Sequence, residues 1–509
     1  MTEQGSPASE IAAGYASEGA ALELGAVVID GAADAAAAVR LPLATLNRHG
    51  LVAGATGTGK TKTLQLISEQ LSAAGVPVVL ADVKGDLSGL AAAGEPNDKV
   101  AKRAQELGDD WAGTAFPVQF LSLGTGGKGS PIRATITSFG PVLLSKVLGL
   151  NETQESTLGL IFHWADQRGL ALLDTKDLRS VITHLTSDEG KEDLKGIGGV
   201  SAATAGVILR SLSNLEAQGG EDFFGEPELD VHDLMRDRDG KGVVTLLELD
   251  NLQAKPALFS TFLMWLLAEL FEELPEEGDL DQPKLVFFFD EAHLLFNDAS
   301  KAFLERIEQT VKLIRSKGVG VFFCTQLPTD IPNNVLSQLG ARIQHALRAF
   351  TPDDQAALAK TVKTYPKTKF YELDTALTSL GIGEAIVTVL SERGAPTPVA
   401  WTRLRAPRSK MGSIGEEAVA AAVASSDLHA KYGETIDRES AYEKLAAKVA
   451  APAPEAAPDA PPPPAEKEKD DPGFIESAMK NPAVKSFMRS AASALGREIT
   501  RGLFGNRRR

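Results

Sequence analysis

Short, uniformly apolar runs alternate along the chain with segments of helical periodicity. Such runs are too short for buried helices and lack the polar alternation of half-exposed strands, so they are typical of strands buried in a parallel sheet. The runs that we interpret as strands are Leu51-Val52-Ala53, Val76 to Asp82, Gly242 to Leu249, Lys284 to Phe289 and Val319 to Cys324. Apolar residues at helical spacing lie between them, at Leu64, Ile67 and Leu71, in Phe259 to Glu273 and in Leu304 to Lys317. This alternation predicts an α/β fold with a doubly wound, mostly parallel sheet.

Other regions depart from the alternation. Between about 130 and 240 the helical spacing continues through three segments, and we expect a helical insertion between strands. These segments are Leu143 to Leu150, Thr157 to Trp164 and Val207 to Leu215. Downstream, Ile382 to Leu390 and Thr397 to Arg403 predict a β-hairpin, and Thr351 before Pro352 predicts a helix start. Residues 1–20 are small and polar, which predicts a flexible N-terminal tail before the strand-like run Leu22 to Ile29.

The C-terminal part changes in composition. Residues 406–449 are expected to form a helical extension. Residues 450–472 are rich in Ala and Pro, with four consecutive prolines at 461–464, and this composition predicts an extended, disordered tether. Residues 473–509 carry eight Lys/Arg against two acidic residues, with apolar positions at helical spacing. We therefore expect a basic amphipathic helix at the end of the tether.

Composition narrows the classes of function. The net charge of −16 excludes a surface that is basic overall, so contact with nucleic acid would need local basic clusters or a pore built by several copies. The single cysteine, Cys324, excludes an intramolecular disulfide. The sequence shows neither a positively charged leader nor an apolar run of about 18 residues, which is the length of a membrane span. We expect a cytoplasmic protein.

Residues 54–61 match the phosphate-binding pattern G-x-x-x-x-G-K-[ST] directly after the strand-like Leu51-Val52-Ala53. The candidate nucleotide-binding residues are Gly54, Ala55, Thr56, Gly57, Thr58, Gly59, Lys60 and Thr61. Glycines let consecutive backbone N–H groups face phosphate oxygens, and a helix that begins near Lys60 adds the positive end of its dipole. Lys60 is expected to reach the β- and γ-phosphates, and Thr61 to offer its hydroxyl to Mg²⁺.

A second candidate feature is the acidic pair Asp290-Glu291 at the end of the apolar run Leu285 to Phe289. Asp290 suits the organisation of Mg²⁺, and Glu291 suits the activation of an attacking water molecule. Gln326, just after the run Val319 to Cys324, is a candidate sensor of the γ-phosphate. Lys84, which follows the strand Val76 to Asp82 at the edge where α/β ligands bind, is a further candidate for nucleotide binding.

These motifs in this order, with Arg342-Ile343-Gln344-His345-Ala346-Leu347-Arg348-Ala349-Phe350-Thr351-Pro352 downstream, resemble the HerA/FtsK group of P-loop motor ATPases, and more closely its bacterial HerA-like branch. The resemblance covers residues from about 22 to 405. It implies a RecA/FtsK-like P-loop NTPase domain at 21–405 with ATP and Mg²⁺ as cofactors. It also implies a homo-oligomeric ring, usually a hexamer, that translocates double-stranded DNA.

The resemblance also implies an arginine supplied across the subunit boundary, which would stabilise charge on the transferred phosphoryl group. Arg342 is the leading candidate by position, followed by Arg315 and Arg348. Four lysines are candidates for a DNA-binding pore, although a solvated surface is the slightly favoured interpretation. They are Lys360, Lys363, Lys367 and Lys369.

Alternatives remain open at this point. An ATP-dependent assembly switch or scaffold could use the tethered C-terminal helix to recruit a protein partner or an anionic membrane. A GTPase is disfavoured because no Asn-Lys-x-Asp tetrapeptide occurs in the sequence. A metabolic kinase is disfavoured because the acidic pair Asp290-Glu291 suits hydrolysis better than transfer to an acceptor.

Overall fold

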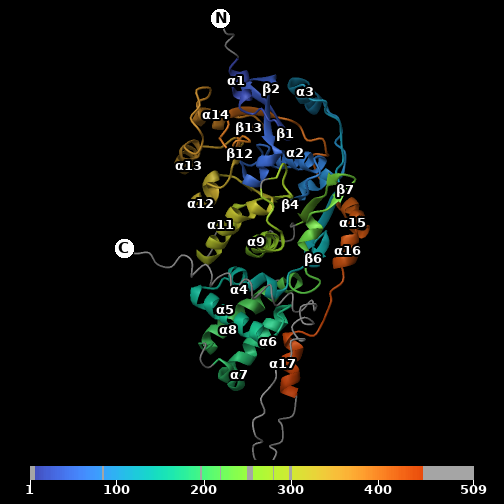
Figure 1. The fold of residues 1–509 in the computed structure, drawn as a ribbon, viewed down its shortest axis with the longest axis vertical. Helices are drawn as coiled ribbons and strands as arrows, with labels where there is room; N and C mark the ends of the chain where they lie inside the picture. Colours follow the sequence, from blue (N-terminus) through green and yellow to red (C-terminus); the bar gives the residue numbers. More distant parts are fainter. Residues whose placement is uncertain are drawn as a thin grey trace, which may run out of the picture. The chain divides into compact units, whose positions relative to one another are not determined.

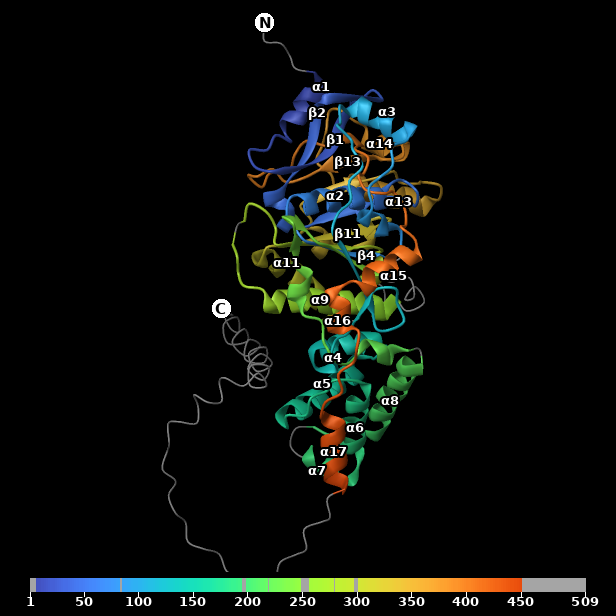
Figure 2. The same cartoon turned by 90° about the vertical axis from the view of Figure 1, so that its right-hand side faces the viewer.

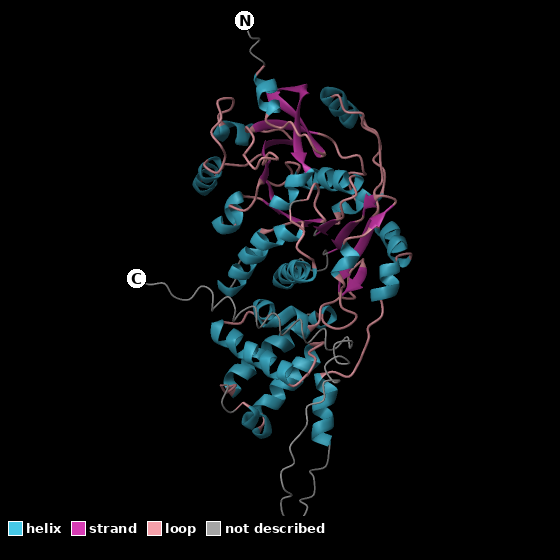
Figure 3. Ribbon diagram, in the orientation of Figure 1, coloured by secondary structure: helices cyan, strands magenta, loops and turns pink. Residues whose placement is uncertain are grey.

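A computed structural model describes residues 6–82, 85–194, 198–217, 219–248, 256–278, 280–296 and 301–450. Figure 1 shows the chain coloured from its N-terminus to its C-terminus, and Figure 3 shows the strands of the sheet with helices around them. The predicted tether, the basic C-terminal helix and Lys84 lie outside the described residues, apart from Ala450 at the start of the tether.

The described residues form a 12-stranded sheet with the order β2-β1-β14-β13-β12-β3-β11-β10-β4-β9-β5-β6. All pairings from β12 to β6 are parallel, and those from β2 to β12 are antiparallel. The parallel strands are β3 (Gly50–Ala53), β4 (Val78–Asp82), β5 (Val118–Leu123), β6 (Ser130–Ile132), β9 (Val244–Glu248), β10 (Leu285–Phe289), β11 (Val319–Thr325) and β12 (Ala341–Gln344). The antiparallel strands are β1 (Ala21–Ile29), β2 (Ala32–Pro42), β13 (Glu384–Thr388) and β14 (Ala400–Leu404). A separate small ribbon pairs β7 (Asp237–Arg238) with β8 (Lys241–Gly242).

The apolar strands bury both faces because successive side chains point to opposite sides of a sheet. On β10, Phe287 and Phe289 belong to one hydrophobic cluster, while Phe288 belongs to the cluster on the other face. The strand is fully buried, which explains why its sequence is a continuous apolar run rather than an alternating one. The predicted fold class is therefore confirmed, with a core on each face of the sheet.

Helices cover the two faces and the ends of the sheet. Those outside the helical insertion and before the C-terminal segment are α1 (Pro7–Ala13), α2 (Lys60–Ala73), α3 (Asp98–Leu107), α9 (Pro256–Glu273), α10 (His293–Phe296), α11 (Lys301–Ile314), α12 (Asn333–Leu336), α13 (Pro352–Val362) and α14 (Leu373–Ser379). Helix α13 begins as its sequence predicts, because the Thr351 side chain accepts a hydrogen bond from the backbone N–H of Asp354. None of the helices in the described ranges is both long and apolar enough to cross a membrane.

Five helices follow β6 and are grouped together in Figure 2. They are α4 (Ile136–Val147), α5 (Glu152–Gln167), α6 (Thr175–Thr186), α7 (Asp188–Asp193) and α8 (Ala202–Ala217). Their buried residues continue the cluster that includes Phe287 and Phe289, and α4 packs directly on α9. The helices therefore share one hydrophobic core with a face of the sheet.

The structure corrects the prediction of a flexible tail at residues 1–20, of which the first five lie outside the described ranges. Residues Pro7–Ala13 form α1, and Ile11 and Tyr15 are buried. The Tyr15 hydroxyl contacts the backbone carbonyl oxygens of Val387 at 2.8 Å and Pro398 at 2.6 Å. Small residues suggested a tail, but one aromatic side chain anchors this segment to the β13–β14 hairpin.

After the sheet, the chain continues as a C-terminal strap, residues 405–450. It contains α15 (Glu416–Ala424), α16 (Asp427–Tyr432) and α17 (Ala441–Ala450). Helix α15 packs against β5, α16 against β6, and α17 against α6 in the helical insertion. Buried Asp177 on α6 accepts hydrogen bonds from the Ser440 hydroxyl and the Tyr442 backbone N–H. The strap thus connects the sheet with the helical insertion.

Candidate nucleotide-binding site

The phosphate loop, residues 54–61, runs from the end of β3 into the first turn of α2, as its sequence predicts. Gly54, Gly57 and Gly59 adopt φ values of 151°, 80° and 119°, a region that favours glycine. The N-terminus of α2 follows directly, so unpaired N–H groups and the positive end of the helix dipole lie at the loop. Both features fit an anionic phosphate group.

Internal contacts hold this loop in shape. The Lys60 ammonium donates to the carbonyl oxygens of Gly54 at 2.6 Å and Ala55 at 3.2 Å, and the Thr58 hydroxyl donates to Ala55 at 2.7 Å. The Gly383 backbone N–H donates to the Thr58 carbonyl oxygen at 3.1 Å. The Lys60 ammonium therefore lies against the loop whose phosphate ligand it is predicted to bind.

The strand register brings the separate motifs to one edge of the sheet. Phe289 of β10 pairs with Phe323 of β11, and Thr325 of β11 pairs with Ala53 of β3. The acidic pair, Gln326 and the phosphate loop therefore all follow the carboxyl ends of adjacent parallel strands. Ligands of open α/β sheets bind at this edge.

Glu291 has an unusual backbone conformation at this edge, with a φ of 47°. Few residues other than glycine adopt this left-handed region, and such strain is found at functional sites. The Glu291 backbone N–H donates to Oδ1 of Asp290 at 2.9 Å, and its Oε2 lies 3.5 Å from Nδ1 of His293. The acidic pair thus lies in a turn that is held by the Asp290 side chain.

Cys324 reports how close the charged groups lie. Burial raises the pKa of its thiol, the carboxylates of Asp290 and Glu291 raise it further, and the Lys60 ammonium lowers it. The Lys60 ammonium and both carboxylates therefore affect the pKa of the same buried thiol. Asp290 and Thr61 supply oxygen donors, which are the ligands that Mg²⁺ prefers.

Gln326 is exposed and directly follows β11, between the strands that carry the other two motifs. The adjacent turn is fixed because Asp330 accepts hydrogen bonds from the Thr325 hydroxyl at 2.7 Å and the Leu327 N–H at 3.0 Å. The position of Gln326 suits the sensor role, which stays a prediction.

The three candidate arginines lie in different surroundings. Arg342 is half-buried in β12 and donates to the carbonyl oxygens of Thr364 at 3.0 Å and Leu336 at 3.4 Å, so it braces its own subunit. Arg348 is exposed and donates to the Thr56 carbonyl oxygen at 3.3 Å, at the tip of the phosphate loop. Arg315 precedes β11, at the opposite edge of the parallel strands.

The four candidate pore lysines are all exposed, and they lie in α13 and the segment after it. Lys369 pairs with Glu10 at 2.6 Å and lies over the ring of Phe370. These surroundings are those of a solvated surface, and a role in DNA binding stays a prediction.

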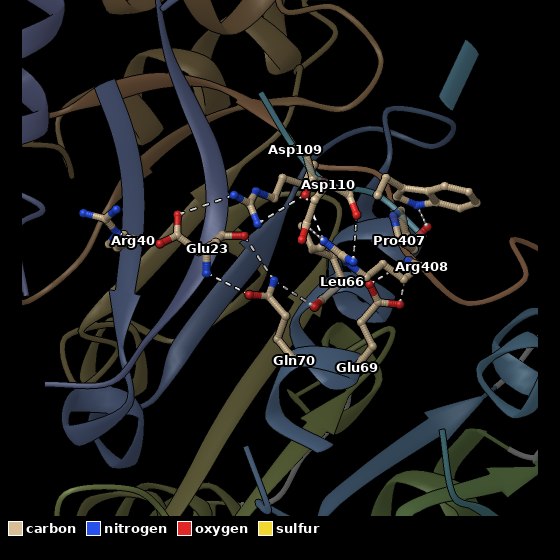
Figure 4. A network of polar contacts seen from close by, with 11 residues as sticks. Glu23, Arg40, Leu66, Glu69, Gln70, Asp109, Asp110, Pro407 and Arg408 are labelled. Atoms are coloured by element: carbon tan, nitrogen blue, oxygen red, sulfur yellow. Dashed lines mark hydrogen bonds and ion pairs between the residues drawn. The ribbon is translucent and has the colours of Figure 1, made fainter. Parts of the chain in front are cut away.

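A polar network behind α2 involves residues that the sequence did not single out (Figure 4). Glu69 accepts a hydrogen bond from the Arg408 backbone N–H at 2.7 Å, and burial raises the pKa of its carboxyl to about 7. Gln70 exchanges hydrogen bonds with the backbone of Glu23 on β1, at 2.7 Å and 3.1 Å. The helix that follows the phosphate loop is therefore held by both β1 and the strap.

Comparison with known proteins decides the family. A family model described as Helicase HerA-like C-terminal matches residues 28–509. The chain belongs to this HerA-like family. Among curated proteins, none matches the HerA-like chain.

Solved structures confirm the P-loop NTPase fold of the HerA-like chain. The unbound bacterial conjugative coupling protein TrwBdeltaN70 has a TM-score of 0.52 at 16% identity, covering 80% of this chain and 94% of that one. TrwB in complex with ADP and Mg²⁺ has a TM-score of 0.52 at 15% identity, covering 79% and 94%. VirB4 of Thermoanaerobacter pseudethanolicus gives 0.45 at 16% identity, covering 76% and 97%. At these identities the two TrwB structures support the fold alone, and VirB4, with its lower TM-score, adds nothing to that support.

Proposed function

We propose that this HerA-like chain is an ATPase that binds ATP with Mg²⁺ at the carboxyl edge of β3, β11 and β10. The observation that carries the proposal is the strand register, which brings the phosphate loop, Gln326 and the acidic pair Asp290-Glu291 to the carboxyl ends of adjacent parallel strands. The structures of TrwB in complex with a non-hydrolysable ATP analogue and with ADP and Mg²⁺ support the choice of ligands.

In this proposal the phosphate loop and Lys60 bind the phosphates, and Lys60 exchanges its contacts with Gly54 and Ala55 for phosphate oxygens. Thr61 and Asp290 would hold Mg²⁺, which would neutralise charge at the transferred phosphoryl group. Glu291 accepts the proton of the attacking water from its place in the turn that follows β10. Gln326 orients that water or senses the γ-phosphate from the intervening strand.

ATP turnover by matched variants tests the proposal. We expect Glu291→Gln to lower kcat by about 10²- to 10⁴-fold while ATP binding persists, because the amide cannot accept the proton. Lys60→Ala should abolish binding and turnover together. Glu305→Gln, on the exposed part of α11, is the control and should behave as wild type. Turnover that survives in Glu291→Gln would refute the assigned base.

We further propose that the chain assembles as a ring and uses hydrolysis to translocate or remodel double-stranded DNA. Family membership supports this finer function, and TrwB is described as a conjugative coupling protein. Turnover measured across protein concentration, with and without linear double-stranded DNA, tests it. Stimulation by both assembly and DNA supports a motor, whereas turnover that ignores DNA favours the assembly switch or scaffold.

Mixing inactive variants identifies the arginine that acts between subunits. Lys60→Ala subunits lack a working phosphate loop but keep every arginine, so they can restore turnover to subunits that lack a trans-acting arginine. Arg315→Ala, Arg342→Ala and Arg348→Ala are each mixed with Lys60→Ala. Restored turnover marks the trans-acting residue. We expect no restoration for Arg348→Ala, because Arg348 contacts the phosphate loop of its own chain.

A further inference from the structure

His345 lies against the phosphate loop although it is far from it in sequence. It follows β12, whose Gln344 pairs with Ala53 of β3, so His345 comes level with Gly54. Its backbone N–H donates to the Ala53 carbonyl oxygen at 2.7 Å, and the Ala55 N–H donates to the Ala346 carbonyl oxygen at 2.9 Å. The β-type pairing therefore extends into the first residues of the loop.

The His345 side chain is completely buried and reaches from the beginning of the loop to its end. A Cβ atom added at Gly54 would lie 2.5 Å from the Cβ of His345, so only glycine fits there. A Cβ atom at Gly59 would lie 3.4 Å from the Cε1 of His345. The Nε2 atom is 2.9 Å from the Thr63 hydroxyl, one turn into α2. The His345 side chain thus lies beside the first and last glycines of the loop, and its ring bonds to the helix behind them.

The electrostatic setting keeps this ring uncharged. Burial, together with the nearby Lys60 ammonium, lowers the pKa of His345 to about 4, while contacts with the backbone of Glu384 and Thr58 oppose the decrease. A neutral ring adds no second cation beside Lys60, so the side chain can fill the space inside the loop across the neutral pH range.

We propose that the His345 imidazole is a positioning residue that holds the phosphate loop in the conformation that receives nucleotide. The proposal rests on the nucleotide binding proposed above and deepens it. His345 touches the loop and α2 rather than the reacting atoms, so its loss affects nucleotide affinity more than the chemical step.

His49 provides a matched control at the other end of β3. It is also buried, with 2% of its surface exposed, and burial lowers the pKa of its ring to about 4. Its ring contacts the Val311 carbonyl oxygen and the Val321 N–H, at the edge away from the phosphate loop. Replacing either histidine removes a buried ring, but only His345 contacts the loop.

The experiment compares His345→Ala, His345→Gln and His49→Ala in the full chain, below the unfolding temperature of each. We expect His345→Ala to raise the KM for ATP by about ten- to a hundredfold with a smaller change in kcat, because misplaced loop amides bind phosphate poorly. His345→Gln should recover most of the affinity, since its amide can still bond the Thr63 hydroxyl. His49→Ala should lower thermal stability without changing the KM.

Amide hydrogen exchange of residues 54–60 without nucleotide gives a second measurement that is independent of hydrolysis. His345→Ala should accelerate exchange in this segment, and His49→Ala should not. Equal KM values and equal loop exchange for the two alanine variants would overturn the inference. If the wild type hydrolyses no ATP, the proposed function fails, while the exchange comparison still decides the role of His345.

Discussion

The ring of His49 makes folding stability sensitive to acid. Its Nε2 lies 2.7 Å from the Val311 carbonyl oxygen, and its Nδ1 accepts from the Val321 N–H at 3.1 Å. A carbonyl can only accept and an N–H can only donate, so these partners suit a neutral ring with its proton on Nε2. Protonation of Nδ1 would place its N–H donor directly opposite the N–H donor of Val321. Burial and, to a smaller extent, the charge of Arg315 lower the pKa from 6.5 to about 4, against the opposing effect of the hydrogen bond to Val311.

The magnitude follows from this difference in pKa. Between pH 6.5 and pH 4 the His49 ring is protonated in the unfolded chain but not in the folded protein. The free energy of unfolding therefore decreases as the pH falls through this window. From pH 7 to pH 5 the loss from His49 amounts to about 2 kcal/mol, at about 1.4 kcal/mol for each pKa unit. His345 contributes a loss of the same sign.

Urea unfolding of wild type and His49→Gln at pH 7 and pH 5 measures this contribution. The variant is less stable at both values because it loses a packed ring, but its loss between pH 7 and pH 5 should be smaller by about 2 kcal/mol. All other titrating groups are shared, so they cancel in the comparison. Equal acid losses in the two proteins would refute a neutral buried His49.

Three further outcomes are expected. Asp177→Ala should lower the free energy of unfolding by about 3 kcal/mol or more, because it leaves several buried donors unpaired. Hydrogen exchange in α17 should then accelerate, and unchanged exchange there would contradict the anchoring of the strap. Tyr15→Phe should lower the free energy of unfolding by about 1 kcal/mol, which is the typical net contribution of a buried hydrogen bond. A thermal melt equal to that of the wild type would support a flexible tail instead. The raised pKa of Glu69 destabilises the wild-type fold as the pH rises from 4.5 towards about 7, because the buried carboxyl then loses its proton. Between pH 5 and pH 8, Glu69→Gln should therefore lose less free energy of unfolding than the wild type. Identical pH profiles would argue against a buried, protonated carboxyl.

Local sequence was enough to predict the candidate nucleotide-binding site. A phosphate loop can be recognised in consecutive residues, because its backbone amides, lysine and threonine all lie within one strand-to-helix turn. The acidic pair is likewise visible in the sequence, since a short, continuous apolar run is typical of a strand buried on both faces and the carboxylates mark where the run ends. The fold class followed from the same runs, and the comparisons confirm it.

Contacts between distant segments decided what the sequence left open. Residues 32–42 are rich in alanine, yet they form β2 because pairing with β1 outweighs a weak local preference. The order β3-β11-β10, which brings Gln326 between the two main motifs, is a property of the assembled sheet. His345 gave no signal of its own, because its contact with Gly54 exists only once β12 pairs with β3. Periodicity and motifs indicate which side of a segment is buried and which residues close in sequence act together. Only strand pairing and packing specify which distant side chains come into contact.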